Sequence, residues 1–224
     1  DALTGSINAS RYDSVNSFVL ETGFNPAATS TISSVTSGVT VEINDEAGTN
    51  TDILAVAITD AEAAGNNSDE LNVKLNDRDA GASSDMGVLS GPGVDFLNIE
   101  TASLNLDGTA GDTTDYVLGV TAAALDKVTV TGNIALNLDT GLTNTIEEVD
   151  ASGMTLASKT ANGLTVSIAT DGTEGVTITG TGGVDDLTGG DGGDAIVGGA
   201  GADTITGGKG ADNLTGGADS DTFV

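Results

Sequence analysis

The chain has 224 residues and a formal net charge of −28, with 34 acidic residues against 6 basic ones, no His and no Cys. Such a surface repels phosphate, which argues against nucleic acid as a partner, and the lack of Cys excludes a disulfide framework. Four Phe and two Tyr are the aromatic residues, so thin stacked β-layers filled by aliphatic side chains are favoured over a bulky globular core. No stretch approaches about 18 consecutive apolar residues, and we expect no membrane insertion.

Apolar residues alternate with a period of two through the first 180 residues, which indicates β-strands. The alternating sets are Val39/Val41/Ile43, Leu54/Val56/Ile58, Leu71/Val73/Leu75, Leu97/Ile99, Leu104/Leu106, Val128/Val130, Ile134/Leu136/Leu138 and Leu164/Val166/Ile168. Clusters of Gly, Asn, Asp, Thr and Ser lie between the sets, as turns require. Short helical turns are predicted at 60–65 and 121–127. The expected fold class is all-β, a parallel β-helix or β-solenoid, with a β-sandwich for residues 1–92 as the alternative.

The strongest internal break is Ser90-Gly91-Pro92-Gly93, because Gly and Pro together interrupt regular structure. It predicts a β-rich solenoid or sandwich segment over residues 1–92 and a β-helix-like segment over 93–179. A third unit covers 180–224. The chain begins at Asp1 rather than Met and ends at Val224 inside a repeat, so we expect a piece of a longer protein.

From residue 180 onward the sequence repeats every nine residues. The units are GTGGVDDLT (180–188), GGDGGDAIV (189–197), GGAGADTIT (198–206), GGKGADNLT (207–215) and GGADSDTFV (216–224). Their sixth residue is always Asp (Asp185, Asp194, Asp203, Asp212 and Asp221), and their eighth is always large and apolar. A low-complexity linker would not keep that apolar position. Residues 171–179 keep it too, so the upstream coils should merge into the array near Val176.

Each unit combines a glycine-rich turn with a short strand, and this combination suits calcium. Glycines allow tight turns in which carbonyls converge, and calcium takes six to eight oxygen ligands at about 2.3–2.6 Å. Two units would make one turn of roughly 18 residues. Asp185, Asp203 and Asp221 would then share one edge, and Asp194 and Asp212 the other. With ions held between stacked loops, three calcium ions are predicted.

The array resembles the RTX family, whose GGxGxDxUx repeat forms a calcium-binding β-roll. The resemblance implies Ca²⁺ as the cofactor, held by the side chains of the five repeat aspartates and by the backbone carbonyls of Gly190, Gly192, Gly199, Gly201, Gly208 and Gly210. Two residues depart from the repeat: Thr181 replaces the second glycine of the first unit, and Asp219 the fourth glycine of the last. The whole chain is therefore predicted to be a β-solenoid ending in a calcium-bound RTX β-roll that folds as it binds metal.

The upstream part resembles RTX-type surface-layer proteins. The similarity lies in LNIETASLNLDG (97–108), DKVTVTGNIALNLDT (126–140), IEEVDASGMT (146–155) and VTITGTGGVDDLTGG (176–190). It implies type I secretion, residence on a Gram-negative cell surface, and calcium-dependent assembly with copies of itself into a two-dimensional lattice. Cell-surface polysaccharide would be a further partner, through regions outside this chain.

A further acidic cluster is DGTAGDTTD, which contains Asp107, Asp112 and Asp115. It is a candidate for an additional calcium site, and the alternative is a solvated turn.

Residue types argue against catalysis. Without His, neither an HExxH zinc site nor a Ser/His/Asp triad can form, and no GxSxG pentapeptide occurs. Carboxylate pairs for glycoside chemistry are available, but the lack of Trp argues against a sugar-stacking cleft. We therefore expect no enzyme. Three roles remain: a surface-layer lattice protein, which is favoured, the stalk of a secreted adhesin, and an accessory module of an exported enzyme.

Overall fold

The computed structural model describes residues 6–8, 17–20, 30–35, 38–45, 56–60, 70–77, 89–97, 100–108, 116–122, 125–139, 146–168 and 174–224. All regular structure in these ranges is β-strand. None of the described residues belongs to a helix that could span a membrane.

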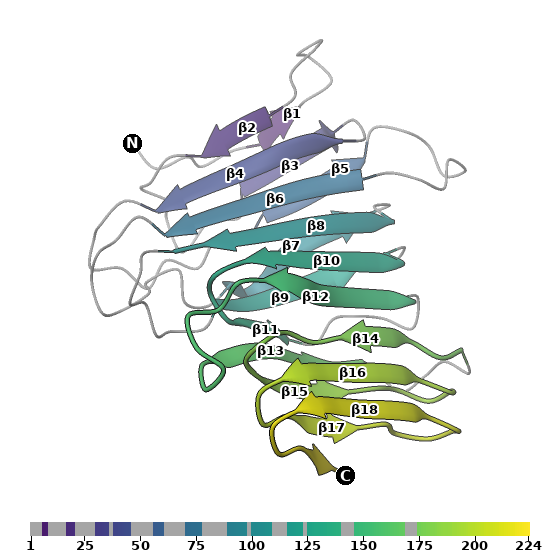
Figure 1. Ribbon diagram of the computed structural model, residues 1–224. Helices are drawn as coiled ribbons and strands as arrows, with labels where there is room; N and C mark the ends of the chain where they lie inside the picture. Colours follow the sequence, from purple (N-terminus) through teal and green to yellow (C-terminus); the bar gives the residue numbers. More distant parts are fainter. Residues whose placement is uncertain are drawn as a thin grey trace.

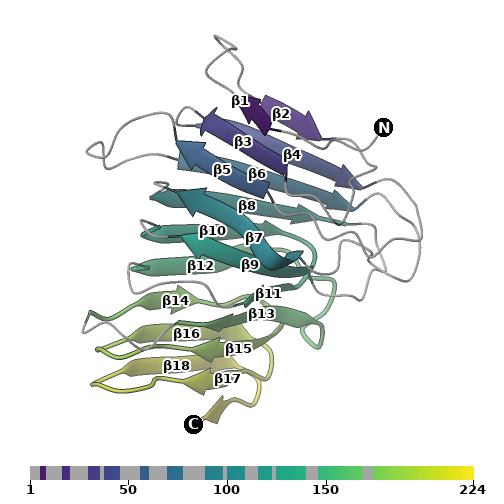
Figure 2. The ribbon, with the colours of Figure 1, turned by 180° about the vertical axis from the view of Figure 1, so that it is seen from behind.

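The strands alternate between two facing parallel sheets (Figures 1 and 2). The ten-stranded sheet contains β1 (Ser6–Asn8), β3 (Ser30–Val35), β5 (Val56–Asp60), β7 (Leu89–Leu97), β9 (Tyr116–Ala122), β11 (Leu136–Asp139), β13 (Asn162–Ser167), β15 (Val184–Thr188), β17 (Thr204–Thr206) and β19 (Thr222–Phe223). The nine-stranded sheet contains β2 (Ser17–Leu20), β4 (Val39–Asp45), β6 (Glu70–Asp77), β8 (Thr101–Asp107), β10 (Lys127–Gly132), β12 (Glu148–Met154), β14 (Thr177–Thr179), β16 (Ala195–Ala200) and β18 (Asn213–Ala218).

Each sheet joins strands that belong to successive coils of the chain. β4 pairs with β6 and β6 with β8, all in parallel, as do β3 with β5 and β13 with β15. This is the predicted parallel β-solenoid. The β-sandwich alternative for residues 1–92 is wrong, because a sandwich of hairpins would pair its strands antiparallel.

The aliphatic core lies between the two sheets and is thickest in the middle of the stack. β6 buries Leu71, Val73 and Leu75, and β8 repeats the pattern with Leu104 and Leu106. Alternation places every second side chain inside, and parallel pairing stacks it on the equivalent residue of the next coil, so Val73 lies over Leu104. The sets predicted at β4, β6, β8 and β10 lie wholly within these strands. Those at β11 and β13 start or end just outside the strand, at Ile134 and Ile168, and Leu54 and Ile99 lie outside the described residues.

A polar column accompanies this core at the ends of β4 and β6. Asn44 and Asn76 are buried and paired in register, and the Asn76 amide donates to Asn44 Oδ1 at 2.6 Å and to Glu42 Oε1 at 2.8 Å. Buried amides are stable only when hydrogen-bonded, and stacked side chains 32 residues apart meet that need here.

Two local predictions differ from the structure. Ser90-Gly91-Pro92-Gly93, the expected break, lies inside β7, where the pairing with β9 shifts register between Leu89 and Val94. The bulge absorbs Pro92 while the sheet continues on both sides. The helical turn expected at 121–127 is also wrong for its described residues, because β9 runs to Ala122 and β10 starts at Lys127. Residues 61–65 lie outside the described part.

The solenoid passes into the nonapeptide array without a change of sheet. β14 pairs with β12 on one side, matching Ile178 to Val149, and with β16 on the other, matching Ile178 to Ile196. The coils below have a constant length, because paired residues such as Ile196 and Leu214 are 18 positions apart. The predicted merging near Val176 is confirmed.

Candidate calcium-binding loops

The turns of the array stack along two edges of the solenoid, as the repeat length predicts. On the first edge, Asp185 N–H donates to Asp203 Oδ1 at 2.9 Å, and Asp203 N–H donates to Asp221 Oδ1 at 3.1 Å. On the second edge, Asp194 N–H donates to Asp212 Oδ1 at 3.0 Å. Each carboxylate therefore lies against the loop above it, 18 residues earlier in the chain.

Glycines at the second and fourth positions of the units let these loops approach so closely. Gly201 has a φ of 120°, and a Cβ there would collide with the carbonyl of Gly183 in the loop above. Gly199 has a φ of 123°, and a Cβ there would collide with the carbonyl of Thr181. The glycines are thus required by the backbone conformation and by a column of carbonyl oxygens. Gly192, Gly208, Gly210 and Gly217 share the positive φ.

Asp203 has a buried carboxylate oxygen to which the protein donates no hydrogen bond. Its side chain is 1% exposed, and Oδ2 is a buried atom with no hydrogen-bond partner. Burial raises the pKa of this carboxyl, opposed by the hydrogen bond from Asp185 and assisted by the charges of Asp221 and Asp219. A buried carboxylate oxygen without a donor is costly unless a cation binds it.

The donor set of these loops fits calcium. Carboxylate and carbonyl oxygens are the hard ligands that calcium prefers, and the glycine-rich turns bring such carbonyls together. In the described part of the chain, no three acidic side chains gather into a metal-binding group. Carbonyls would therefore supply most of the ligands and the repeat aspartates the charge. The six predicted glycine ligands lie in these turns: Gly199 and Gly201 on the first edge, and Gly190, Gly192, Gly208 and Gly210 on the second.

The first loop, with Thr181 in place of glycine, is built differently. Asp185 Oδ1 accepts hydrogen bonds from Leu164 N–H at 2.5 Å and from the Thr181 hydroxyl at 2.8 Å, and Oδ2 accepts one from Thr181 N–H at 2.7 Å. The Thr181 hydroxyl also accepts from Gly183 N–H at 2.9 Å. Burial raises the pKa of Asp185 to about 6 despite these bonds. Protein donors thus surround this carboxylate.

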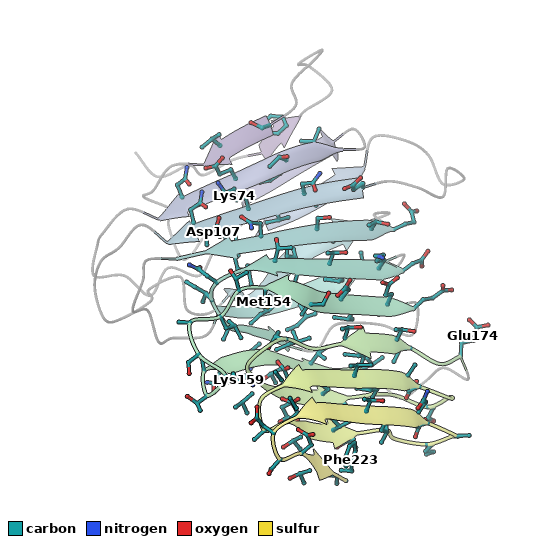
Figure 3. All side chains as sticks on the ribbon, in the orientation of Figure 1. Lys74, Asp107, Met154, Lys159, Glu174 and Phe223 are labelled. Carbon is teal, nitrogen blue, oxygen red and sulfur yellow. The ribbon has the colours of Figure 1, made fainter. Side chains whose placement is uncertain are left out.

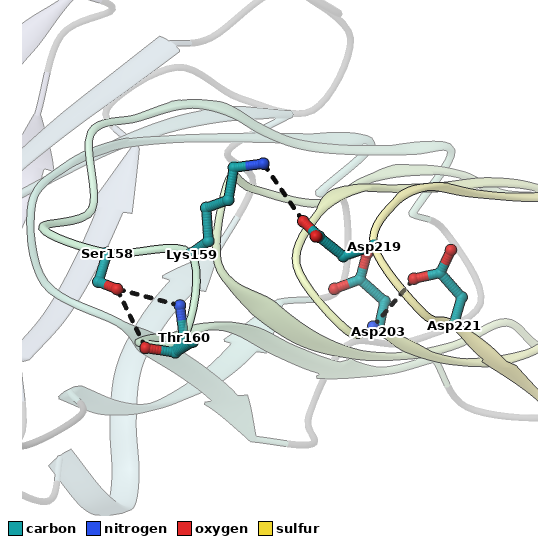
Figure 4. A network of polar contacts seen from close by, with 6 residues as sticks. All are labelled: Ser158, Lys159, Thr160, Asp203, Asp219 and Asp221. Atoms are coloured by element: carbon teal, nitrogen blue, oxygen red, sulfur yellow. Dashed lines mark hydrogen bonds and ion pairs between the residues drawn. The ribbon is translucent and has the colours of Figure 1, made fainter.

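The last loop shows the second departure. Asp219 takes a φ of 81°, which among the described non-glycine residues is the one positive value. Its carboxylate forms an ion pair with Lys159, 3.2 Å away and 60 residues earlier (Figure 4). Lys159 belongs to the turn between β12 and β13, which the Ser158 hydroxyl orders through contacts with Thr160. The turn therefore reaches past two loops of the first edge.

The second edge contains its own ion pair. Lys209 Nζ lies 2.8 Å from Asp191 Oδ2, joining the third residues of two stacked units, and the two residues also form a β-bridge. On the outer face of the nine-stranded sheet, Lys127 pairs with Glu148 at 2.9 Å. Figure 3 shows the side chains of the described residues on the coils, with the charged residues Lys74, Asp107, Lys159 and Glu174 among those labelled.

The candidate site outside the array is only partly within the described residues. Asp107 ends β8, half-buried, beside Gly108, which exchanges hydrogen bonds with the Asn133 side chain. Asp112 and Asp115 lie outside the described residues. The proposal of a calcium site there stays a prediction.

Sequence reasoning missed two contributors to the array. Thr181 was recognised as a departure, but its hydrogen bonds to Asp185 were not foreseen; a hydroxyl four residues before a buried carboxylate is a usable signal. Lys159 gave no signal, because no pattern links positions 60 residues apart.

Comparison with known proteins identifies the repeats. Residues 188–223 match the family of the RTX calcium-binding nonapeptide repeat, in four copies. Searches of curated proteins and of solved structures returned no match.

Proposed function

We propose that this chain, whose C-terminal array is an RTX calcium-binding β-roll, is a structural component of a calcium-dependent bacterial surface layer and assembles with copies of itself into a two-dimensional lattice. RTX-repeat proteins are typically secreted. The observation that carries the proposal is the continuity of one parallel solenoid, from β1 to β19, into the calcium-binding array. Such a body offers extended sheet faces for contacts between copies.

Charge supplies the link between calcium and assembly. Copies with a net charge of −28 repel one another at close range. Calcium bound in the array reduces this charge and at the same time orders the loops. One site filled at a hundredfold excess over its Kd stabilises the fold by roughly 2.7 kcal/mol, so three sites supply at most about 8 kcal/mol. That is comparable to the stability of a whole domain.

Export gives this dependence a use. The array buries one aliphatic residue in each of β15, β16 and β17, and it has many acids and much glycine entropy to lose. Without metal it therefore does not complete its folding at low calcium. Millimolar calcium outside the cell then folds the array where the lattice is to form. No catalytic role is part of the proposal.

The test is a calcium titration of the purified chain followed by circular dichroism, light scattering and negative-stain electron microscopy. The lattice role predicts β-structure and ordered sheets that appear together at millimolar calcium and vanish with chelator. Magnesium is the control ion, because it holds its waters tightly and demands octahedral geometry. Folding without assembly at any protein concentration would overturn the lattice proposal.

A second candidate is the stalk of a secreted adhesin, favoured by the same unbranched stacking of coils along one axis (Figure 1). A stalk would remain monomeric and become rigid with calcium. Small-angle scattering at low and high calcium separates the two roles. With calcium, a stalk should become more rigid at constant molecular mass, whereas the lattice protein should increase in molecular mass.

A further inference from the structure

We infer that the five repeat aspartates are of two kinds: Asp203, Asp212 and Asp221 bind calcium, whereas Asp185 and Asp194 are hydrogen-bonded caps that close the upper end of each edge without metal. This departs from the expectation that all five are ligands. The inference rests on calcium binding by the array and is independent of the lattice role.

The two cap aspartates have both carboxylate oxygens occupied by the protein. Asp194 Oδ1 accepts from Val176 N–H at 2.8 Å and Oδ2 from Gly190 N–H at 3.0 Å. Asp185 repeats this arrangement with Leu164 and Thr181, and the Thr181 hydroxyl adds a third donor. In both loops the second residue of the unit donates its N–H to its own aspartate.

The other three loops lack this closing hydrogen bond. Their second residues, Gly199, Gly208 and Gly217, have φ values of 123°, 104° and 115°, whereas Thr181 and Gly190 are not among the described residues with positive φ. The changed backbone turns the N–H away, and Asp203 Oδ2 is left buried without a donor. A carboxylate in this state provides a charged oxygen for a cation.

Position in the stack explains the division. Asp203, Asp212 and Asp221 each lie below another nonapeptide loop, against the N–H of Asp185, Asp194 and Asp203 respectively. The loop above and the loop that holds the aspartate can then both contribute carbonyls beside each of these carboxylates. Asp185 has no nonapeptide above it, since its upper neighbours are Leu164 and the turn ending at Ala161, whose carbonyl accepts from Val184 N–H at 2.8 Å.

Thr181 fits this role as a positioning residue. A hydroxyl at the second position donates to Asp185 and accepts from Gly183, so it occupies space between carboxylate and turn that the glycine-bearing loops leave open. The departure from the repeat thus marks the point where the metal-dependent part of the first edge begins. The caps would present a preformed template on which the lower loops stack.

Equilibrium dialysis of the full chain with radioactive calcium tests the inference. The wild type is expected to bind three ions. D185N and D194N, which keep the side-chain shape, should still bind three, with affinities changed less than about threefold. D203N, D212N and D221N should each lose at least one ion. Loss of an ion in D185N or D194N, or five ions in the wild type, would overturn the inference.

A second pair of variants decides the matter if D185N does not fold. T181V removes the hydroxyl at nearly constant volume and T181S keeps it. In saturating calcium, T181V should lower the melting temperature while T181S restores it, and both should retain three ions. An ion count changed by T181V would contradict a cap. Failure of these chains to form sheets by microscopy would bear on the lattice role alone.

Discussion

The solenoid up to residue 168 and the nonapeptide array from residue 180 onward share one topology but are stabilised by different means. Strands such as β6 and β8 bury three aliphatic side chains each, whereas β15, β16 and β17 bury one: Leu187, Ile196 and Ile205. Burial of one such side chain stabilises by about 1.5–3 kcal/mol, so each coil of the array has far less apolar stabilisation. A constant repeat with a thin core can therefore persist only with metal at its edges.

The two regions also differ in the polar residues that stack along their edges. In the upper coils the Asn76 amide donates hydrogen bonds to Asn44 Oδ1 and to Glu42 Oε1. In the array the stacked residues are carboxylates, which repel each other unless donors or cations separate them. One fold can thus be stabilised with or without metal, depending on which polar residues stack along its edges.

Removal of calcium should have the largest effect and should separate the two regions. With chelator, amides of residues 198–224 are expected to lose protection from hydrogen exchange, while those of β6, β8 and β10 keep it. The reason is that metal binding and folding are coupled in the array alone. Mass spectrometry of exchanged peptides measures this, and calcium addition should reverse it. Equal loss of protection in both regions would show that the whole solenoid depends on metal.

A cavity in the core of the upper coils should destabilise these coils and leave the array unaffected, the reverse of calcium removal. Leu104 is 1% exposed, and Leu104→Ala is expected to lower the free energy of unfolding of the upper coils by about 2–5 kcal/mol. The calcium midpoint of the array should not change. Denaturant melts at saturating calcium and calcium titrations followed by circular dichroism measure the two quantities. Ile205→Ala is the matched variant in the array, where the calcium midpoint should rise instead.

A single methyl group should distinguish a stacked glycine from a free one. Gly201→Ala forces a positive φ and a collision with the Gly183 carbonyl, at a cost of about 1–3 kcal/mol or more. Gly182→Ala is the control, because a Cβ there meets nothing within 4 Å. We expect the calcium midpoint to rise in the first variant and to stay constant in the second. A shift of equal size in both would argue against the stacked carbonyl column.

Acidity should affect the two regions with opposite signs. The folded pKa of Asp185, raised by burial to about 6 from 3.8, means that the folded chain binds more protons, so its contribution to stability is lost as pH rises from about 4 to 6. Hydrogen bonds from Ser152 lower the pKa of Asp150 in the folded chain. The contribution of Asp150 to stability is therefore present above the ordinary carboxyl pKa of 3.8 and is lost as the pH falls through the lowered pKa. Melting temperatures measured at several pH values check this. D185N should reduce the fall in stability as the pH rises from about 4 to 6, and D150N should reduce the loss of stability at low pH.

The smallest effect is expected from removing the ion pair between Lys127 and Glu148 on the outer face of the nine-stranded sheet. Lys127 and Glu148 are about 40% exposed (41% and 38%), so Lys127→Ala should change stability by less than about 1 kcal/mol. Raising the salt concentration should remove even that difference. A thermal melt with and without salt checks this, and a larger loss would indicate that the pair orders its sheet.

The sequence predicted what depends on periodicity and missed what depends on unlike neighbours. Alternation located β6 and β10, and the nine-residue period gave the stacking of Asp203 on Asp185. β12 was not predicted as an alternating strand, because its buried residues Val149, Ala151 and Met154 include a small side chain and break the period.

The candidate calcium ligands could likewise be predicted only in part. The positions of the repeat aspartates follow from the period, but whether a carboxylate is open or closed depends on a single backbone angle at Gly199 or Gly190. No residue pattern distinguishes those two glycines, since both follow a glycine. The difference comes from what lies above each loop, which is a property of the stack.

The ion pair between Lys159 and Asp219 has a mechanical consequence. Strands of the array hold partners 18 residues away, so a tension on the C-terminus would peel the coils off one by one, each parting before the next is loaded. Lys159 sits 60 residues upstream and holds the lowest turn from the side. Force entering at Val224 would therefore also load the turn between β12 and β13 through this exposed ion pair, and not the neighbouring coil alone.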